Sequence, residues 1–207
     1  MPSADPAGAG PTPALPGLDH PKPDFHPGDD ELVHQGWVIA LHRATFEGPD
    51  GQTFERDIVR HPGAVAVVAV TGQGSVVLVH QYRPAVDQWV LEIPAGTRDV
   101  TGEAPERTAL RELAEEAGYA AVDLTLLTRC LVTPGFCDEV SSVYLATGLS
   151  PVPVDRQGVE EHAMEVVEVP LDRFDELVDQ GVVVDATTIL GVGLARRHLA
   201  AAVTPPL

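Results

Sequence analysis

The chain has 207 residues with 31 acidic and 13 basic side chains, which gives a formal net charge of -18 at pH 7. This length allows one mid-sized domain with a substantial core, and the negative field excludes nucleic acid and anionic membrane as natural partners. A small molecule that bears phosphate would be repelled too, unless bound cations reversed the charge locally.

The cysteines and the N-terminal residues indicate a compartment. Cys130 and Cys137 have no metal-ligand spacing and do not form a framework of the secreted kind, which favours a reducing environment. Residues 1–27 lack the basic start and the continuous apolar stretch of a signal peptide, and no apolar run is long enough to span a bilayer. We therefore expect a soluble cytoplasmic protein.

The first part of the chain is predicted to be a tail. Residues 1–30 are crowded with Pro, Gly, Ala and Asp, a composition that cannot bury enough apolar surface to offset the entropy of ordering it. We expect residues 1–30 to be flexible and residues 31–207 to form one domain.

The domain is expected to begin with strands in residues 31–59. Residues 48–51 read Gly-Pro-Asp-Gly, and this turn with the β-prone segment 53–59 predicts a hairpin. Alternate apolar positions place four side chains on one face of a single strand: Val33, Trp37, Ile39 and Leu41.

Beyond residue 60 the patterns change between strand and helix. β-prone or apolar runs predict strands at residues 64–70, 75–82, 89–93, 124–131, 140–147 and 164–170. Helices are predicted at residues 105–117, 171–178 and 185–202. The chain has no internal repeat, so the predicted fold class is α/β: a mixed sheet in an α/β/α sandwich, with an N-terminal β-hairpin region.

The predicted helix at residues 105–117 has three glutamates on one face. Glu112, Glu115 and Glu116 are three and four residues apart, so their side chains converge. We call these three side chains the acidic face. Like charges so close repel one another, and hard divalent cations that bridge the oxygens would relieve the repulsion.

Two interpretations of the acidic face are open. It is either a solvated helix surface, with Arg107 and Arg111 as partners, or a site for Mg²⁺, with Mn²⁺ as the alternative ion. In the second case the cation would cancel the charge of a pyrophosphate and acidify a water for attack at phosphorus.

The stretch from Gly96 to Tyr119 closely resembles the Nudix box, the loop-helix-loop motif of the Nudix hydrolases. The box reads glycine, five residues, glutamate, seven residues and then R-E-U-x-E-E-x-G-U, where U is apolar. Here Glu103 is followed by seven residues and then by Arg-Glu-Leu-Ala-Glu-Glu-Ala-Gly-Tyr. One departure is present, because six residues separate Gly96 from Glu103. The resemblance implies a Nudix-type fold and a Mg²⁺-dependent hydrolase.

The resemblance also implies roles for individual residues. It assigns metal ligation to the acidic face, with Glu112 and Glu116 as principal ligands, and to the backbone carbonyl of Ala95. Arg111 and Glu103 resemble the pair that locks the loop onto the helix and orients the carboxylates. The alternative for this pair is an ordinary surface ion pair, which would not fix geometry.

Further strings resemble the ADP-ribose pyrophosphatase branch of the family. Pro134 stands fifteen residues beyond Tyr119, at the offset that marks this branch. The strings Gly-Ala-Val at 63–65, Gln-Tyr-Arg at 81–83 and Leu-Glu-Ile-Pro-Ala-Gly at 91–96 are similar to that branch as well.

In that branch the general base is a glutamate on a mobile loop after the box. The loop at residues 155–162 offers Glu161 as the base that takes a proton from the attacking water, with Glu160 as the alternative.

The resemblance also suggests contacts to the substrate. Arg83 and Arg56 are placed to hold phosphates or the terminal ribose, because guanidinium groups suit phosphate oxygens. Glu92 and Glu139 resemble the carboxylates that accept hydrogen bonds from ribose hydroxyls. The alternative for all four is a surface ion pair.

The implied reaction is hydrolysis of ADP-ribose, a nucleoside diphosphate sugar, to AMP and ribose 5-phosphate. The family usually works as a homodimer in which N-terminal strands cross to the partner and help form the adenine pocket. Here those strands would lie in residues 31–59, with Trp37 or Phe46 against the base.

Two rivals remain open. One is the same fold with another substrate, such as a nucleotide sugar, a dinucleoside polyphosphate or a flavin dinucleotide. The other is a sensor that binds ADP-ribose without cleaving it and regulates transcription. The chain has no basic helix-turn-helix segment and its box glutamates are complete, which favours the enzyme.

Overall fold

The computed structural model describes residues 24–203, which divide into two compact units. The first unit contains the described residues up to Gly63 together with Leu131–Val140. The second unit contains Ala64–Cys130 and the described residues from Ser141 onward. Within the described part of the chain, no helix is both long and apolar enough to cross a bilayer.

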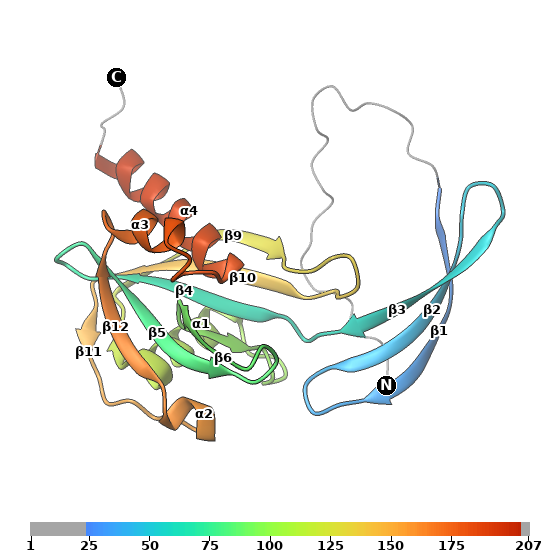
Figure 1. Ribbon diagram of the computed structural model, residues 1–207, viewed down its shortest axis with the longest axis horizontal. Coiled ribbons are helices and arrows are strands. Elements are labelled where there is room, and N and C mark those ends of the chain that lie inside the picture. The colour runs from blue at the N-terminus through green and yellow to red at the C-terminus, as the bar shows by residue number, and fades with distance from the viewer. Residues whose placement is uncertain (1–23, 204–207) are drawn as a thin grey trace. The chain divides into compact units, whose positions relative to one another are not determined.

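The first unit is built on a three-stranded antiparallel sheet in the order β1-β2-β3 (Figure 1). Its strands are β1 (His26–Gln35), β2 (Ala40–Glu47) and β3 (Thr53–Arg60). At the turn between β2 and β3, Gly51 donates its N–H to the Gly48 carbonyl at 2.9 Å. The predicted N-terminal hairpin is therefore present.

The prediction of one strand through Val33, Trp37, Ile39 and Leu41 is wrong. The chain turns between β1 and β2, where Gly36 donates its N–H to the Ile39 carbonyl at 2.9 Å. A Cβ at Gly36 would lie 2.8 Å from that oxygen, so glycine permits the turn. Alternation of apolar residues does not detect such a turn. β1 also begins at His26, before the expected start of the domain; residues 1–23 of the predicted tail lie outside the described residues.

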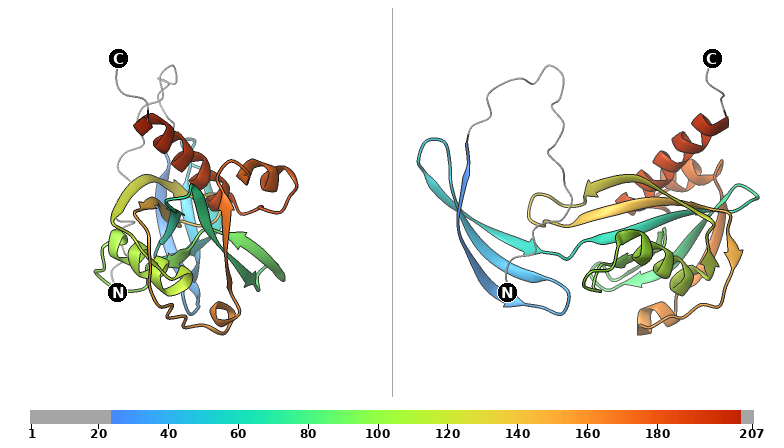
Figure 2. Two further views of the ribbon diagram at one scale, coloured as in Figure 1. Left: turned by 90° about the vertical axis from the view of Figure 1, so that its left-hand side faces the viewer. Right: turned by 180° about the vertical axis from the view of Figure 1, so that it is seen from behind.

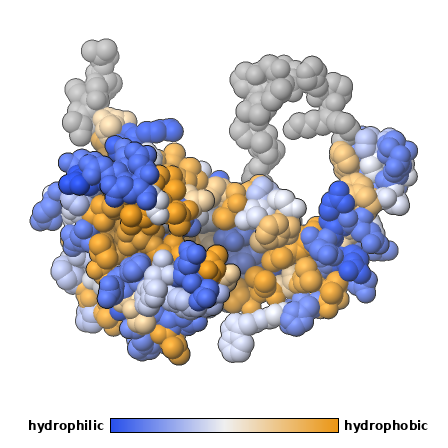
Figure 3. Space-filling model, viewed as in Figure 1, coloured by the Kyte–Doolittle hydropathy of each residue, from blue (hydrophilic) through white to orange (hydrophobic). Residues whose placement is uncertain are grey.

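The first unit exposes apolar side chains (Figure 3). Every residue of β1 is exposed, and Trp37 is exposed over its whole side chain. The other large apolar residues at this surface are Leu32, Val33, Val38 and Ile39. Within the described residues, these apolar side chains are therefore left uncovered by the first unit.

A mixed sheet forms the centre of the second unit, in the order β12-β5-β4-β10-β9, with β6 paired to β5 and β7 paired to β4. β10 runs parallel to β4, whereas β12, β5, β6 and β7 pair antiparallel. The strands are β4 (Ala64–Val70), β5 (Ser75–Arg83), β6 (Gln88–Glu92), β7 (Ala95–Thr97), β9 (Asp123–Leu131), β10 (Val140–Thr147) and β12 (Glu165–Pro170). β8 (Tyr119–Ala120) and β11 (Ser150–Pro151) form a separate two-stranded sheet.

Helices cover both faces of this sheet (Figure 2). They are α1 (Pro105–Ala117), α2 (Val159–His162), α3 (Phe174–Asp179) and α4 (Ala186–Val203). Successive residues of β4 point to opposite faces: Val67 packs in the cluster that contains Leu113 of α1, and Val68 packs in the cluster that contains Val192 of α4. The predicted α/β/α arrangement is confirmed.

Candidate active site

Helix α1 positions the acidic face. Pro105 occupies its first turn, and Gly118 ends it in the left-handed conformation (φ 72°), donating its N–H to the Ala114 carbonyl at 3.1 Å. Ala109 and Leu113 are completely buried against β4 and β5. This packing fixes the rotation of the helix, and with it the side on which the glutamates lie.

Glu116 is buried although it can carry a charge. Its side chain is 5% exposed, and its Oε2 accepts the Ala95 N–H at 3.0 Å. Burial raises the pKa of Glu116 to about 8; the Ala95 hydrogen bond lowers it, and the nearby charges of Glu112 and Glu161 raise it further. Burial likewise raises the pKa of Glu112 to about 7, with Arg111 opposing the shift.

Gly96 makes room for Glu112. A Cβ built at Gly96 would collide with the Glu112 carboxylate, at distances that real atoms do not adopt. A side chain at position 96 would therefore displace the Glu112 carboxylate from its place. This contact accounts for a glycine at Gly96 despite the extra residue between it and Glu103.

Arg111 is the cation at the acidic face. Its Nη1 lies 2.9 Å from Glu112 Oε1 and 2.8 Å from Glu115 Oε2, and its Nη2 lies 3.6 Å from Glu103 Oε2. Glu103 also accepts the Thr108 hydroxyl hydrogen bond at 2.9 Å. The structure brings the predicted pair Arg111 and Glu103 together, and it adds that Arg111 lies closer to the two glutamates of its own helix.

The acidic face offers donors for a hard divalent cation. Within residues 24–203, no three His, Cys, Asp or Glu side chains surround one point that a cation could occupy. Mg²⁺ takes few protein carboxylates and completes its shell with waters and substrate phosphates, so an incomplete protein cage fits this ion. Buried carboxyl groups with raised pKa values gain from a cation that displaces their protons. The donor chemistry therefore fits Mg²⁺ or Mn²⁺.

Arg83 and Glu92 form an ion pair within the second unit. Arg83 Nε donates to Glu92 Oε2 at 2.9 Å, and Gln81 Nε2 donates to the same oxygen at 2.9 Å. Glu92 is buried, whereas the Arg83 side chain is 45% exposed. Glu92 therefore orients Arg83, and the exposed part of the guanidinium remains accessible to an anionic ligand.

The two candidate bases, Glu160 and Glu161, lie in the short helix α2, where the sequence predicted a loop. The Glu161 carboxylate accepts the Gln157 N–H at 2.8 Å. Its charge is among those that raise the pKa values of Glu112 and Glu116, so it lies near the acidic face. Glu160 is exposed on the same short helix.

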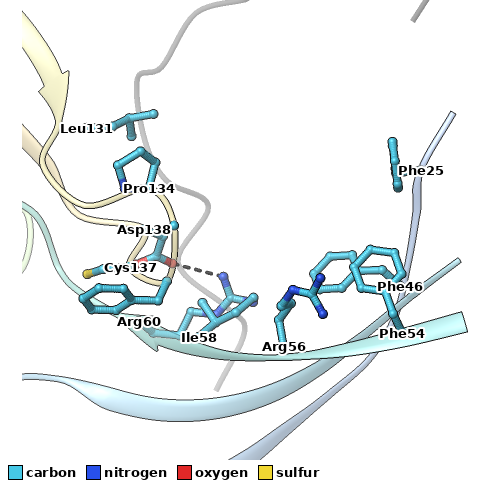
Figure 4. A pocket seen from close by; sticks show the side chains of 12 residues that line it. Phe25, Phe46, Phe54, Arg56, Ile58, Arg60, Leu131, Pro134, Cys137 and Asp138 are labelled. Carbon is cyan, nitrogen blue, oxygen red and sulfur yellow. Dashed lines mark hydrogen bonds and ion pairs between the residues drawn. The ribbon is translucent and has the colours of Figure 1, made fainter. Parts of the chain in front are cut away.

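The first unit contains an aromatic pocket of about 500 Å³ (Figure 4). The Phe46 and Phe54 rings stack at 5.5 Å, and the Arg56 guanidinium lies 4.7 Å from the Phe54 ring centre. The lining residues are Phe25, Phe46, Phe54, Arg56, Ile58, Arg60, Leu131, Pro134, Gly135, Phe136, Cys137 and Asp138. Of the predicted residues, Arg56, Phe46 and Pro134 line this pocket, whereas Glu139 and Trp37 do not line it.

Several residues of the pocket were not predicted from the sequence. Phe54, Ile58 and Arg60 occupy alternate positions of β3 together with the predicted Arg56, so period-two alternation could have placed them on one face. Asp138 accepts a hydrogen bond from Arg60 Nη1 at 3.1 Å and fixes the loop of residues 131–140 beside β3. Because 78 residues separate the two partners, no local pattern predicts this pairing.

Comparisons with known proteins agree with this geometry. The NUDIX domain model matches residues 60–188. The ADP-ribose pyrophosphatase of Bacillus subtilis (strain 168) is 44% identical over 162 residues, covering 78% of this chain and 87% of the relative. The ADP-ribose pyrophosphatase of Mycobacterium tuberculosis (strain ATCC 25618 / H37Rv) is 39% identical over 169 residues, covering 82% of each protein.

A solved structure supports the fold separately. It is described as the crystal structure of an ADP compounds hydrolase and superimposes with a TM-score of 0.75 over 88% of this chain and 97% of that chain. At 23% identity it bears on the fold alone. The family model, the relatives and the box from Gly96 to Tyr119 agree, and the chain belongs to the NUDIX family, within its ADP-ribose pyrophosphatase branch.

Proposed function

We propose that this protein hydrolyses the pyrophosphate of ADP-ribose to AMP and ribose 5-phosphate. The observation that supports this most is the pair of carboxyls with raised pKa values on α1, the buried Glu116 and the partly buried Glu112, with Gly96 in close contact with Glu112. The similarity to two ADP-ribose pyrophosphatases supports the choice of substrate.

The acidic face and the Ala95 carbonyl would hold the divalent ion, Mg²⁺ or alternatively Mn²⁺. When bound, the ion would neutralise charge on the phosphoryl oxygens and make a water more acidic. Arg111 would balance the charge of Glu112 and Glu115 and keep them oriented, with Glu103 beside it.

We propose Glu161 as the general base. Its carboxylate would take a proton from the water as the new phosphorus–oxygen bond forms and the bridging bond breaks. The effect of Glu161 on the pKa values of two residues of the acidic face supports this choice over Glu160. Arg83, held by Glu92, would bind a phosphate oxygen with the exposed part of its guanidinium.

The aromatic pocket is our candidate for the adenine base. Phe46 and Phe54 offer flat apolar surface, and Arg56 adds a positive charge beside it. The position of Glu139 in the loop next to this pocket is consistent with a contact to ribose hydroxyls, which stays a prediction.

We also propose that the protein is a homodimer. The exposed apolar side chains of the first unit, Trp37 above all, are of the kind that a second copy would cover. Sedimentation at micromolar concentration tests this proposal: a dimer that Trp37→Glu converts to a monomer supports it, and a parent that sediments as a monomer contradicts it.

The reaction is tested by products. Incubation with ADP-ribose and Mg²⁺ in heavy-oxygen water should release AMP and ribose 5-phosphate, with the label in one of them. Glu116→Gln should lower kcat by at least about 100-fold, because a metal ion supplies several kcal/mol of transition-state stabilisation. A variant that cleaves as fast as the parent would contradict the metal assignment.

The choice of substrate needs a panel. Nucleotide sugars, dinucleoside polyphosphates and flavin dinucleotide should be cleaved with lower kcat/KM than ADP-ribose. If ADP-ribose is cleaved poorly and another compound of the panel is cleaved rapidly, that compound replaces ADP-ribose as the proposed substrate. Tight binding of ADP-ribose without product would favour the sensor.

A further inference from the structure

We propose that Arg156 is a positioning residue that fastens the loop with Glu161 to the end of helix α1. The catalytic consequence rests on the proposed function, in which Glu161 is the base. The hydrogen bonds of Arg156 go to backbone carbonyls, those of Glu116 and Met164. We call residues 157–163 the base loop.

The first contact lies at the C-terminal end of α1. Arg156 Nη2 and Nε donate to the Glu116 carbonyl at 3.1 Å and 3.3 Å. The last four carbonyls of a helix lack partners within the helix, and the negative end of the helix dipole favours a cation. Arg156 therefore supplies both a hydrogen-bond donor and a positive charge where α1 needs them.

The second contact lies at the far end of the base loop. Arg156 Nη1 donates to the Met164 carbonyl at 2.6 Å. Met164 is buried in the core cluster that also contains Leu113 of α1. One guanidinium thus joins the residue before the base loop to the residue after it, and joins both to the helix that presents the acidic face.

Backbone hydrogen bonds also join the segment before the base loop to the C-terminal end of α1. Val152 donates its N–H to the Gly118 carbonyl at 2.8 Å, and Asp155 donates its N–H to the Glu115 carbonyl at 3.3 Å. Apart from those of Arg156, the hydrogen bonds of the base loop in the described part of the chain join its residues to one another and to its flanks; the Gln157 N–H, for example, donates to Glu161 Oε2. Arg156 therefore adds a side-chain link between α1 and both flanks of the base loop, and we expect the position of Glu161 to depend in part on this link.

The geometry requires arginine. A guanidinium presents donors in a fixed planar fork, so it reaches two carbonyls on different segments at once. A lysine would keep the charge at the helix end but offers a compact ammonium on a flexible stem. A lysine at position 156 should therefore restore the positive charge at the end of α1, but only part of the hydrogen bonding that positions the base loop.

The kinetic test compares Arg156→Ala and Arg156→Lys with Arg173→Ala. Arg173 pairs with Glu176 at the surface of the same unit and serves as the matched control. We expect Arg156→Ala to lower kcat about 10- to 100-fold with little change in KM, since misplacement of a catalytic group by about 1 Å costs that much. Arg156→Lys should recover part of the loss, and Arg173→Ala should match the parent.

A double-mutant cycle separates positioning from general damage. If Arg156 acts through Glu161, then Arg156→Ala combined with Glu161→Gln should be no slower than Glu161→Gln alone. Losses that multiply would show that Arg156 does not act through Glu161, and would overturn the proposal. An unchanged kcat in both Arg156→Ala and Arg156→Lys would overturn it as well.

Hydrogen–deuterium exchange without substrate gives a readout that does not need activity. Amides of residues 157–163 should exchange faster in Arg156→Lys and Arg156→Ala than in the parent, while those of α4 keep their rates. If the parent fails to cleave ADP-ribose, the proposed function fails, yet this exchange result still decides the structural part. Unchanged exchange in the base loop would contradict the fastening role of Arg156.

Discussion

The acidic face and the aromatic pocket are specified by the sequence in different ways. The acidic face comes from one continuous segment, in which helical spacing places Glu112, Glu115 and Glu116 together. The aromatic pocket combines β2 and β3 with the loop at 131–140, which is far from these strands along the chain. Helical periodicity can reveal the first kind of site, whereas the second depends on strand register and on long-range contacts.

The two regions also differ in chemistry. The acidic face consists of carboxyls, and burial raises the pKa values of two of them, Glu112 and Glu116, so it favours cations. The pocket consists of aromatic rings with Arg56 and Arg60, so it favours a flat or negatively charged group. Substitutions in the acidic face should therefore change kcat and metal affinity, and substitutions in the pocket should change KM.

The largest effect is expected at the base. Glu161→Gln should lower kcat by about 10²- to 10⁴-fold, the usual contribution of a general base. Glu160→Gln removes the same charge one residue earlier and should leave kcat close to that of the parent. Steady-state kinetics with ADP-ribose checks both variants. A greater loss for Glu160→Gln would make Glu160 the base. Equal losses would contradict the choice of Glu161 over Glu160.

Gly96→Ala should damage the acidic face without removing any carboxylate. The added methyl group would displace Glu112, so we expect metal affinity to fall about 10- to 100-fold, as it does when the support of a ligand is removed. Gly72→Ala is the matched control, because a Cβ there meets nothing within 4 Å. Calorimetric titration with Mn²⁺ measures both; normal affinity in Gly96→Ala would show that the close approach has no bearing on the metal.

Phe54→Ala should act on the pocket alone. Loss of the stacked ring should raise KM about five- to tenfold, corresponding to about 1–1.4 kcal/mol of binding, with kcat and Mn²⁺ affinity unchanged. Glu47→Ala, at an exposed residue of β2 outside the pocket, should leave KM unchanged. If Phe54→Ala instead lowered kcat at constant KM, the pocket would not be a binding region distinct from the acidic face.

The pH dependence of stability should have an unusual sign. Because folding raises the pKa of Glu116 to about 8 and that of Glu112 to about 7, the metal-free folded protein holds more protons than the unfolded chain. The stability from these two groups is complete at acid pH and is lost as pH rises through 7 and 8. Urea unfolding between pH 5.5 and 8.5 should show this loss, and Glu116→Gln should reduce it; a loss of equal size in that variant would contradict the assignment.

Local patterns predicted much of the second unit. The apolar run of β4 and the amphipathic helix α1 have the predicted bounds, since burial on both faces of a strand and on one face of a helix leaves clear periodicities. Within the box, Arg111 lies beside Glu103, Glu112 and Glu115, whereas the convergence of the three glutamates on one cation stays a prediction. In these segments the local preference and the tertiary packing agree.

Tertiary contacts account for what the sequence analysis missed. The turn at Gly36 interrupts a run whose alternation looks continuous. The pairing of Arg60 with Asp138 and the contact of Arg156 with the carbonyls of Glu116 and Met164 join distant segments. Every residue has a backbone carbonyl, so the sequence does not indicate which carbonyls an arginine will bind. The contacts of Arg156 could therefore be found only from the structure.

The central claim is that divalent ions displace protons from buried glutamates of α1. Calorimetric titration of Mn²⁺ at pH 7, in two buffers with different ionisation enthalpies, measures metal uptake and proton release together. We expect Mn²⁺ binding with release of roughly one proton. The affinity for Mn²⁺ should rise as pH goes from 6 to 8 and should fall sharply in Glu116→Gln. Absence of metal uptake by the folded protein, alone and with a diphosphate ligand, would contradict it.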